Sequence, residues 1–371
     1  MKRNTSDQWA AVHADGQGQG RHRRASSRMR ELAAGRRASL PAAANPRHDS
    51  GPPPPDRESR RKKPVRLIAA AAVAMALAIA LGIGLYGRFA DGRSPAPTSY
   101  LGVYTTGLPE SYAGVSAFTA ATGVRPGLVM YYSGWQERFQ TGFAQEAARR
   151  GAVPLVQMEP TGVSLAAIAA GRYDSYLRSY AASVKVFGGR VVLSFGHEMN
   201  GYWYPWGNRH TAPAAFVAAW RHVVTVFRQQ GAGNVAWLWT VNIIDAHGGI
   251  PSPARWWPGG KYVTMVGIDG YYLKPAWTFA SLFGPTIKAV RALTLDKILI
   301  TETGAPNTPG QSAKVANLFA GIRAYGLLGF VWFDAVARHE LPRNGIRDWR
   351  LHSAPAFAAF RRGARGYRPP S

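Results

Sequence analysis

The chain has 371 residues and carries 45 Lys and Arg against 20 Asp and Glu, which gives a net charge of +25. This length suffices for one large domain with additional segments. The absence of cysteine excludes disulfides and any thiolate chemistry, whether as a nucleophile or as a metal ligand. A basic chain can bind nucleic acid, but much of the charge precedes residue 67, so we expect no nucleic-acid partner.

Residues 1–66 contain 16 basic and 6 acidic residues and few large apolar ones. Such a segment cannot bury enough apolar surface to fold, which predicts a disordered basic cytoplasmic tail. Residues 67–87 form an uncharged run of 21 residues, close to the ~20 that a helix needs to cross a bilayer. The basic residues just before this run predict, by the positive-inside rule, that everything after it is extracellular.

A cleaved signal peptide is the alternative to a membrane anchor at residues 67–87. The apolar part of such a peptide is typically ~7–15 residues long and is followed by a small-residue cleavage site. This run is longer, and the sequence after it offers no clear site. We therefore expect an uncleaved, single-pass anchor followed by a linker at residues 88–99; the protein would be secreted if the anchor were cleaved.

From residue 100 to residue 363, short apolar runs alternate with amphipathic or Ala-rich stretches. The apolar runs are 101–104, 128–132, 153–158, 191–195, 235–241, 263–268, 298–301 and 328–333. The helical stretches are 113–121, 136–150, 165–187, 212–230, 278–293, 312–325 and 354–362. Eight strands alternating with helices predict a (β/α)8 TIM barrel, with a long loop from His247 to Gly260 and a basic tail at residues 364–371.

Chemistry in such barrels lies where the strands end and the following loops begin. The fourth run ends in His197, Glu198, Met199 and Asn200, and an aromatic cluster follows directly. The seventh run ends at Glu302, and lies across the barrel mouth from the fourth. A carboxylate that ends a buried strand is rarely built for stability, because buried strands disfavour charge.

Glu198 and Glu302 are the pair that we expect to react together. Two carboxylates at ~5–5.5 Å across a cleft make a retaining glycosidase, with one as acid/base and the other as nucleophile. Aromatic burial and the second carboxylate would raise the pKa of the acid, while a donor such as Tyr271 or His197 would orient the nucleophile. Tryptophans provide flat faces for sugar rings; the candidates are Trp203, Trp206, Trp256, Trp257, Trp277 and Trp332.

Other chemistries have weaker support in the sequence. His197, Glu198, Asp269 and His247 could bind a metal, but the H-E-x-x-H and H-x-x-E-H spacings are absent, so we expect neither metal nor cofactor. The G-x-S-x-G motif of serine hydrolases is also absent. Asp269 is expected to support the site through hydrogen bonds, and Glu159 either caps a turn or lines the cleft.

Three motifs carry a resemblance to a known family. HEMNGYWYPWG, GIDGYY and ITETG resemble the strand-four, strand-six and strand-seven motifs of glycoside hydrolase family twenty-six, the β-mannanase-like family. The resemblance spans residues 101 to about 360. It implies that Glu198 is the acid/base and Glu302 the nucleophile, with Tyr271 as hydrogen-bond partner of the nucleophile.

The resemblance also implies a substrate class and a set of binding residues. We expect an endo-acting enzyme on an extracellular polysaccharide, with β-1,4-mannan first and mixed-linkage β-glucan or β-1,3-xylan as alternatives. The expected substrate-binding residues are His197, Asn200, Trp203, Trp206, Tyr271, Trp332 and Glu159. The catalytic domain is expected to be monomeric. A non-catalytic, membrane-anchored barrel that binds polysaccharide is the alternative from a different class.

Overall fold

A computed structural model describes residues 97–244, 249–337 and 347–370 of the chain. The expected tail, anchor and most of the linker, residues 1–96, lie outside this part, as does His247. Within the described part, no helix combines the length and the apolar character that a membrane crossing requires.

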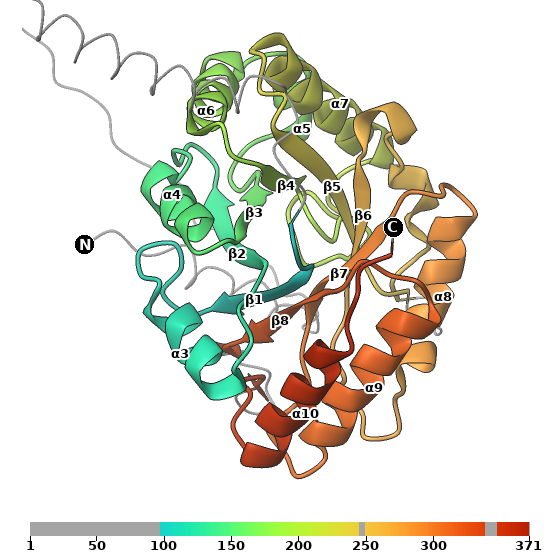
Figure 1. Cartoon of the computed structure of the whole chain (residues 1–371). Coiled ribbons are helices and arrows are strands. Elements are labelled where there is room, and N and C mark those ends of the chain that lie inside the picture. The colour runs from blue at the N-terminus through green and yellow to red at the C-terminus, as the bar shows by residue number, and fades with distance from the viewer. Residues whose placement is uncertain (1–96, 245–248, 338–346, 371) are drawn as a thin grey trace, which may run out of the picture. The chain divides into compact units, whose positions relative to one another are not determined.

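The eight expected strands are present and form one closed parallel barrel in chain order, which confirms the predicted fold (Figure 1). Each strand is almost fully buried, as expected for a parallel sheet covered by helices. The strands are β1 (Leu101–Thr105), β2 (Leu128–Gly134), β3 (Val153–Glu159), β4 (Val191–Phe195), β5 (Val235–Asn242), β6 (Met265–Asp269), β7 (Ile298–Thr303) and β8 (Phe330–Asp334).

The helices surround the barrel and pack their apolar faces on it (Figure 1). They are α3 (Ala113–Thr122), α4 (Thr141–Arg149), α5 (Leu165–Ala169), α6 (Asp174–Phe187), α7 (Pro213–Gln229), α8 (Phe279–Arg291), α9 (Gln311–Ala324) and α10 (Ala354–Arg365). A short hairpin of β9 (Val336–Ala337) and β10 (Arg347–Asp348) follows β8.

The structure differs from the expected elements at a few boundaries. The helix expected at 165–187 is broken into α5 and α6 around Gly171, whose φ of 79° is left-handed. The helix expected from residue 136 begins at Thr141. The loop between β5 and β6 contains two 3-10 turns, η1 (Pro253–Trp256) and η2 (Gly260–Tyr262).

The C-terminal segment is part of the barrel rather than a separate tail from residue 364. Helix α10 runs to Arg365, and Tyr367 is buried beyond it. The Tyr367 hydroxyl donates to the Leu328 carbonyl and accepts from the Tyr100 amide at 3.3 Å. The segment therefore fastens the entry of β8 to the entry of β1.

A layer of small polar side chains fills the barrel interior below the mouth. Ser194 donates to Thr240 at 3.0 Å. A Cβ atom added to Gly267 would lie 2.6 Å from the Thr240 hydroxyl and 2.1 Å from the Thr301 hydroxyl. Glycine is therefore required at this position, because the two threonines already occupy the space.

Candidate active site

Glu198 lies in a tight turn directly after β4. Its backbone has a φ of 55°, in the left-handed region that a residue with a side chain rarely adopts. The Glu198 amide donates to the Thr240 carbonyl at 3.0 Å, and the Glu198 carbonyl accepts from the Gly201 amide at 2.8 Å. Strained backbone of this kind persists where the surrounding structure holds it, often at functional sites.

Two neutral donors hold the Glu198 carboxylate. The Trp203 indole nitrogen donates to Oε2 at 2.7 Å, and the Asn242 amide donates to Oε1. The Trp203 ring folds back over Gly201, where an added Cβ would lie 2.4 Å from the ring. The Gly-Tyr-Trp sequence after Asn200 thus allows the indole to reach the carboxylate from five residues away.

Asn200 acts through Asn242 instead of facing a substrate. Its side-chain amide donates to the Asn242 carbonyl at 2.9 Å, and its side-chain oxygen accepts from the Asn242 amide at 2.8 Å. Asn200 is fully buried and its hydrogen-bonding groups face the backbone. The expectation that Asn200 binds substrate is therefore wrong for this structure, and its contacts fix the residue that holds Glu198.

Glu302 is held by two tyrosine hydroxyls, one to each carboxylate oxygen. Tyr132 donates to Oε1 at 2.6 Å and Tyr271 donates to Oε2 at 2.9 Å. The contact from Tyr271 is the one that the family resemblance implied. Tyr132, at the end of β2, also lies beside His197, with ring centroids 5.7 Å apart, and so links the two halves of the site.

An irregularity in β7 directs Glu302 into the mouth. Against β8, Ile300 pairs with Phe330 and Thr303 pairs with Trp332, so β7 has one residue more than its partner. Thr301 already faces the barrel interior, where it meets Gly267. Because side chains alternate along a strand, Glu302 would point outward without the extra residue, which is the usual effect of a β-bulge.

Burial raises the pKa of both carboxyl groups. Burial and the charge of Glu302 raise the pKa of Glu198 to about 8, against the opposing effect of its Asn242 and Trp203 donors. Burial raises the pKa of Glu302 to about 7, and the Tyr132 and Tyr271 hydroxyls oppose that rise. The charged form of Glu302 is thus supported by two hydroxyl donors, and the charged form of Glu198 by an indole and an amide donor.

Two further carboxyl groups lie close to this pair. Glu159 ends β3, and burial together with the charge of Glu302 raises its pKa to about 8. Asp269 pairs with Glu302 between β6 and β7 and is fully buried. Burial and the charges of Glu302 and Glu198 raise the pKa of Asp269 well above its usual range. The ends of β3, β4, β6 and β7 therefore bring four carboxyl groups close enough to affect one another's pKa values.

His197 and Trp206 belong to a packed aromatic layer beneath the turn. The His197 Nε2 atom lies 3.0 Å from the Tyr204 hydroxyl, and the Trp206 indole donates to the His197 carbonyl at 2.8 Å. Tyr204 and Trp206 stack at 4.4 Å with their planes 8° apart. Trp206 is 2% exposed, so the expectation that it stacks on sugars is wrong, and it supports the backbone of the turn instead.

Trp332 is also buried on the outer side of the barrel. Trp332 lies two residues after Phe330, which packs on Phe319 of α9 and Phe360 of α10. Residues two apart share one face of a strand, so both side chains face the helices. Its indole donates to the Trp349 carbonyl at 3.1 Å. The residue of β8 that faces the site is Phe333, whose ring lies 5.9 Å from that of Tyr271.

The expected sugar platform in the loop after β5 is only partly available. Trp256 is fully buried, so it does not offer a surface face. Trp257 is partly buried and packs edge-on against Trp239 at 5.0 Å. Trp203 and Trp277 are the other partly buried tryptophans that the sequence singled out.

Sequence reasoning missed three residues of the site: Tyr132, Asn242 and Phe333. Each lies at or next to the end of a predicted strand, which is the signal that would have found them. Strand-end position alone does not decide whether a side chain faces the site, and none of the three is charged.

Comparisons with known proteins agree with this site. Residues 186–306 match the model of glycosyl hydrolase family 26, a segment that includes both Glu198 and Glu302. Endoglucanase H of Acetivibrio thermocellus is 29% identical over 286 residues, which cover 70% of this chain and 31% of that protein. Mannan endo-1,4-beta-mannosidase A and B of Caldalkalibacillus mannanilyticus is 27% identical over 163 residues, which cover 42% of this chain and 29% of that protein.

The chain thus spans about three tenths of the length of these two relatives. A solved structure of a Cellulomonas fimi endo-beta-1,4-mannanase double mutant has a TM-score of 0.57 and 17% identity, with 72% of this chain and 71% of that chain covered. At this identity, the similarity establishes the barrel fold alone.

The structure defines a closed (β/α)8 barrel with paired carboxyl groups at the ends of β4 and β7. The segment that holds both groups is similar to glycosyl hydrolase family 26, and the curated relatives that the chain resembles are an endoglucanase and a mannan endo-1,4-beta-mannosidase.

Proposed function

We propose that this barrel is a retaining, endo-acting β-glycoside hydrolase with β-1,4-mannan as its substrate class. The observation that carries the proposal is the placement of two buried carboxyl groups at the ends of β4 and β7, each held by two neutral donors. Glu302 accepts hydrogen bonds from the Tyr132 and Tyr271 hydroxyls, and Glu198 accepts from the Trp203 indole and the Asn242 amide. Burial raises the pKa of both groups, which suits a pair that holds one proton, with one ionised nucleophile and one protonated acid.

In the first step, the Glu302 carboxylate attacks the anomeric carbon and Glu198 donates its proton to the departing glycosidic oxygen. The bond to the leaving sugar breaks as the ester to Glu302 forms. In the second step, Glu198, now ionised, takes a proton from water, and that water displaces Glu302 from the anomeric carbon. Both carboxyl groups return to their initial protonation states, and the product keeps the configuration of the substrate.

The Trp203 indole donates a hydrogen bond to Glu198 and is partly exposed, so its ring can also border the sugar whose bond is cleaved. In this proposal, His197 and Tyr271 line the substrate site together with Tyr132. Glu159 lines the same end of the barrel and would accept hydrogen bonds from sugar hydroxyls.

The choice of mannan as the substrate class rests on the names of the two curated relatives. One is a mannan endo-1,4-beta-mannosidase and the other an endoglucanase, so β-glucan is the second candidate substrate. Mixed-linkage β-glucan and β-1,3-xylan remain alternatives. A non-catalytic polysaccharide-binding barrel is less favoured, because it would have no use for two buried carboxyl groups whose pKa values are raised toward neutrality.

We also propose that the domain is displayed outside the cell on an N-terminal membrane anchor. The uncharged run at 67–87 and the basic residues before it support this arrangement. Protease added to intact cells should remove the barrel and leave a protected N-terminal fragment. Recovery of a soluble mature form that begins near Ser94 would instead indicate a cleaved signal.

A panel of polysaccharides tests the catalytic proposal. The full chain should release reducing ends from mannan as a ladder of oligosaccharides, which identifies endo action, and the Glu302→Gln variant should release none. Release from β-glucan or xylan alone would replace mannan as the substrate class. No release from any β-linked polymer, with retained binding to one of them, would favour the non-catalytic barrel.

A further inference from the structure

The end of the barrel opposite the candidate active site carries a distinctive combination of exposed side chains. Because all eight strands are parallel, the residues just before each strand gather at one end, which we call the entry face. The entry face consists of the last turns of the helices and the connections that lead into the strands. Glu198 and Glu302 lie at the strand ends, on the other side of the barrel.

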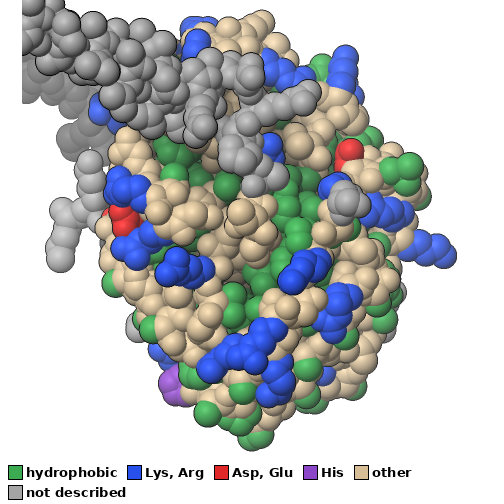
Figure 2. Space-filling view, in the orientation of Figure 1, with side chains coloured by type: hydrophobic (Ala, Val, Ile, Leu, Met, Phe, Trp, Pro, Cys, Tyr) green, Lys and Arg blue, Asp and Glu red, His purple; other side chains and the backbone are tan. Residues whose placement is uncertain are grey.

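The entry face is strongly basic. Exposed cationic residues lie in the approach to most strands, among them Arg125, Arg149, Lys185, Arg228, Lys297 and Arg368. Of the residues that the structure describes there, Glu146 and Asp296 are the acidic ones, and Glu146 is already paired with Arg149 and Arg150. Figure 2, in the orientation in which the C-terminal segment of the entry face lies toward the viewer, shows many Lys and Arg side chains and few acidic ones.

Large aliphatic side chains protrude from the same face. Leu295, in the connection between α8 and β7, is 89% exposed, and Val186, at the end of α6, is 80% exposed. Each lies next to cations, since Lys297 follows Leu295 and Lys185 precedes Val186. Single exposed aliphatic residues are ordinary on protein surfaces. Two highly exposed aliphatic side chains that lie next to cations are the combination with which peripheral proteins contact anionic bilayers.

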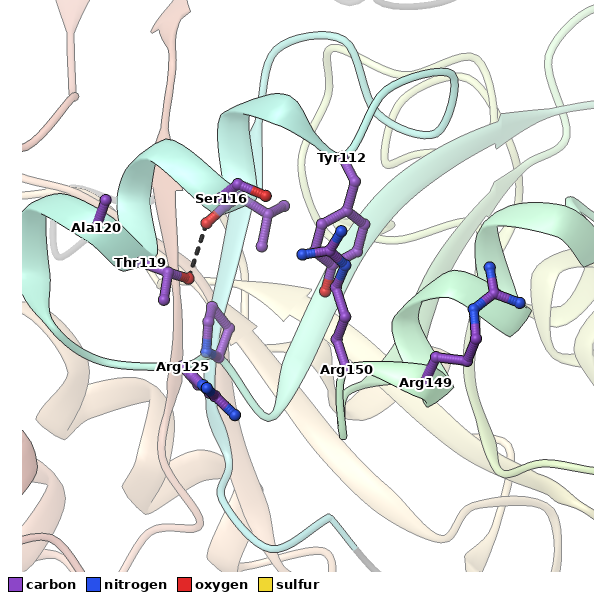
Figure 3. Close-up of a pocket in the computed structure, with 9 residues that line it drawn as sticks. Tyr112, Ser116, Thr119, Ala120, Arg125, Arg149 and Arg150 are labelled. Atoms are coloured by element: carbon purple, nitrogen blue, oxygen red, sulfur yellow. Dashed lines mark hydrogen bonds between the residues drawn. The ribbon is translucent and has the colours of Figure 1, made fainter.

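A groove at the margin of this face adds a place for an anionic group. It encloses about 440 Å³ between α3 and α4, with Arg125, Arg149 and Arg150 on its walls and Ser116 and Thr119 between them (Figure 3). The Arg150 guanidinium lies 4.7 Å from the centre of the Tyr112 ring, which holds it extended along the groove. Guanidinium groups are usual partners of a phosphate, and the two that Arg149 and Arg150 bring to the groove share the single Glu146 carboxylate.

The chain itself joins the barrel at this face. Tyr100 and Ser99 lead directly into β1, and Tyr100 is fastened there through Tyr367. The described chain therefore enters the barrel at this face.

We infer that the entry face docks on an anionic phospholipid bilayer, with its cations on the headgroup phosphates and Leu295 and Val186 reaching the acyl boundary. Docking would point the catalytic mouth away from the membrane, toward polymer in the surroundings. The inference does not depend on which polysaccharide is cleaved, nor on whether residues 67–87 span the membrane. Each juxtamembrane cation contributes electrostatic attraction that salt screens.

The absence of cysteine from the chain allows a direct test with the full-length protein. Leu295→Cys would carry an environment-sensitive fluorophore, and Leu273→Cys, in the exposed loop after β6, would be its matched control. Both proteins would be added to phosphatidylcholine vesicles with and without phosphatidylglycerol, with a spin-labelled lipid as quencher. Comparison of two positions in the same chain separates docking of the barrel from binding by the basic N-terminal segment.

We expect a blue shift and quenching of the label at 295 on the anionic vesicles alone, with the label at 273 unaffected. Reversal of charge by Lys297→Glu and Arg368→Glu should abolish the response at 295, whereas Lys274→Glu and Arg209→Glu, in the loops that follow β6 and β4, should preserve it. Equal quenching at the two positions would overturn the inference, and so would a response that survives reversal at the entry face. Circular dichroism of each variant would show that the fold is retained.

Discussion

At the scale of single residues, the Glu198 and Glu302 carboxyl groups accept hydrogen bonds from neutral donors, and neither forms a salt bridge with another described residue. Glu198 accepts from Trp203 and Asn242, and Glu302 accepts from Tyr132 and Tyr271. An arginine or lysine in their place would lower both pKa values far more strongly. Neutral donors leave the two groups able to exchange protons near neutral pH, which acid/base catalysis requires.

Loss of a tyrosine hydroxyl should change the acidic limb of the activity profile. Tyr132 donates to the ionised form of Glu302 and so lowers its pKa. Tyr132→Phe removes the donor, so the pKa of Glu302 should rise and the acidic limb of kcat/KM should move to higher pH. Loss of a hydrogen bond to a charged group costs about 1.5–3 kcal/mol, or about 10–150-fold in kcat/KM at neutral pH. An unchanged pH profile would show that Tyr132 does not act on Glu302.

The basic limb of the kcat/KM profile should change when Asn242 is replaced. Its amide stabilises the ionised form of Glu198 and so lowers the pKa of that group. Asn242→Ala should raise the pKa further, so the proton needed for the first step is retained to higher pH. The basic limb of kcat/KM should therefore extend upward, as measured with the same pH series. A basic limb that stays in place or moves downward would assign that limb to another group.

At the scale of elements, the barrel was predictable because its strands are short, apolar and rich in β-branched residues, and alternate with amphipathic helices. The orientation of particular side chains was not. Trp332 and Phe333 are neighbours of similar character in the sequence, and only the register of β8 against β1 and β7 decides which one faces the site. No residue type in the sequence of β7 predicts the bulge that turns Glu302 inward.

The aromatic turn after β4 shows the same limit. The sequence identified the cluster around Glu198 as functional, and Trp203 does contact the carboxylate. Trp206, three residues later, packs on Tyr204 and supports the backbone. Asn200 was assigned to the substrate because it follows Glu198, yet its hydrogen bonds go to Asn242 at the end of the neighbouring strand β5 and to the Pro251 carbonyl. Such contacts between residues far apart in the sequence become visible only in the folded chain.

The polar layer beneath the site predicts a strict requirement at one strand position. Gly267→Ala would place a methyl group against the hydroxyls of Thr240 and Thr301. Overpacking of a filled interior typically costs about 1–3 kcal/mol, so the free energy of unfolding should fall by that amount. Chemical denaturation would measure it, with Gly233→Ala, in an open position before β5, as the matched control. Equal stability of both variants would mean that the threonines move aside.

At the scale of the whole molecule, the acidic residues of the barrel are concentrated at its mouth and the basic ones over its surface. Five carboxyl groups near the strand ends have raised pKa values, those of Glu159, Glu198, Asp269, Glu302 and Asp334. Burial is the largest cause in each case. Carboxyl groups that hold protons near neutral pH are thus buried at the strand ends, whereas the basic side chains lie on the exterior, where they can contact anionic partners.

The stability of the protein should consequently fall as the pH rises from about 5 to about 8. A carboxyl group whose pKa is higher in the folded than in the unfolded state stabilises the fold fully below the unfolded value. That stabilisation is lost as the pH rises through the folded value. With pKa values of about 7 and about 8 for Glu302 and Glu198, the loss should extend from about pH 5 to about pH 8.

Denaturant titrations between those limits would measure this slope. Asp269→Asn should reduce it, because this variant removes one of the coupled buried groups. Stability that increases across the same range, or a slope that Asp269→Asn leaves unchanged, would contradict the raised pKa values of the buried carboxyl groups.

The most direct test of the account is the anomeric configuration of the products formed by two variants with azide. With a dinitrophenyl β-mannoside, whose leaving group needs no proton, Glu198→Ala should form the glycosyl ester on Glu302 and accumulate it, because no base activates water. Azide should restore turnover and yield the β-glycosyl azide, while Glu302→Ala should yield at most the inverted α-azide. An α-azide from Glu198→Ala, or full activity of both variants on polysaccharide, would contradict the assignment and transfer the search to Glu159 and Asp269.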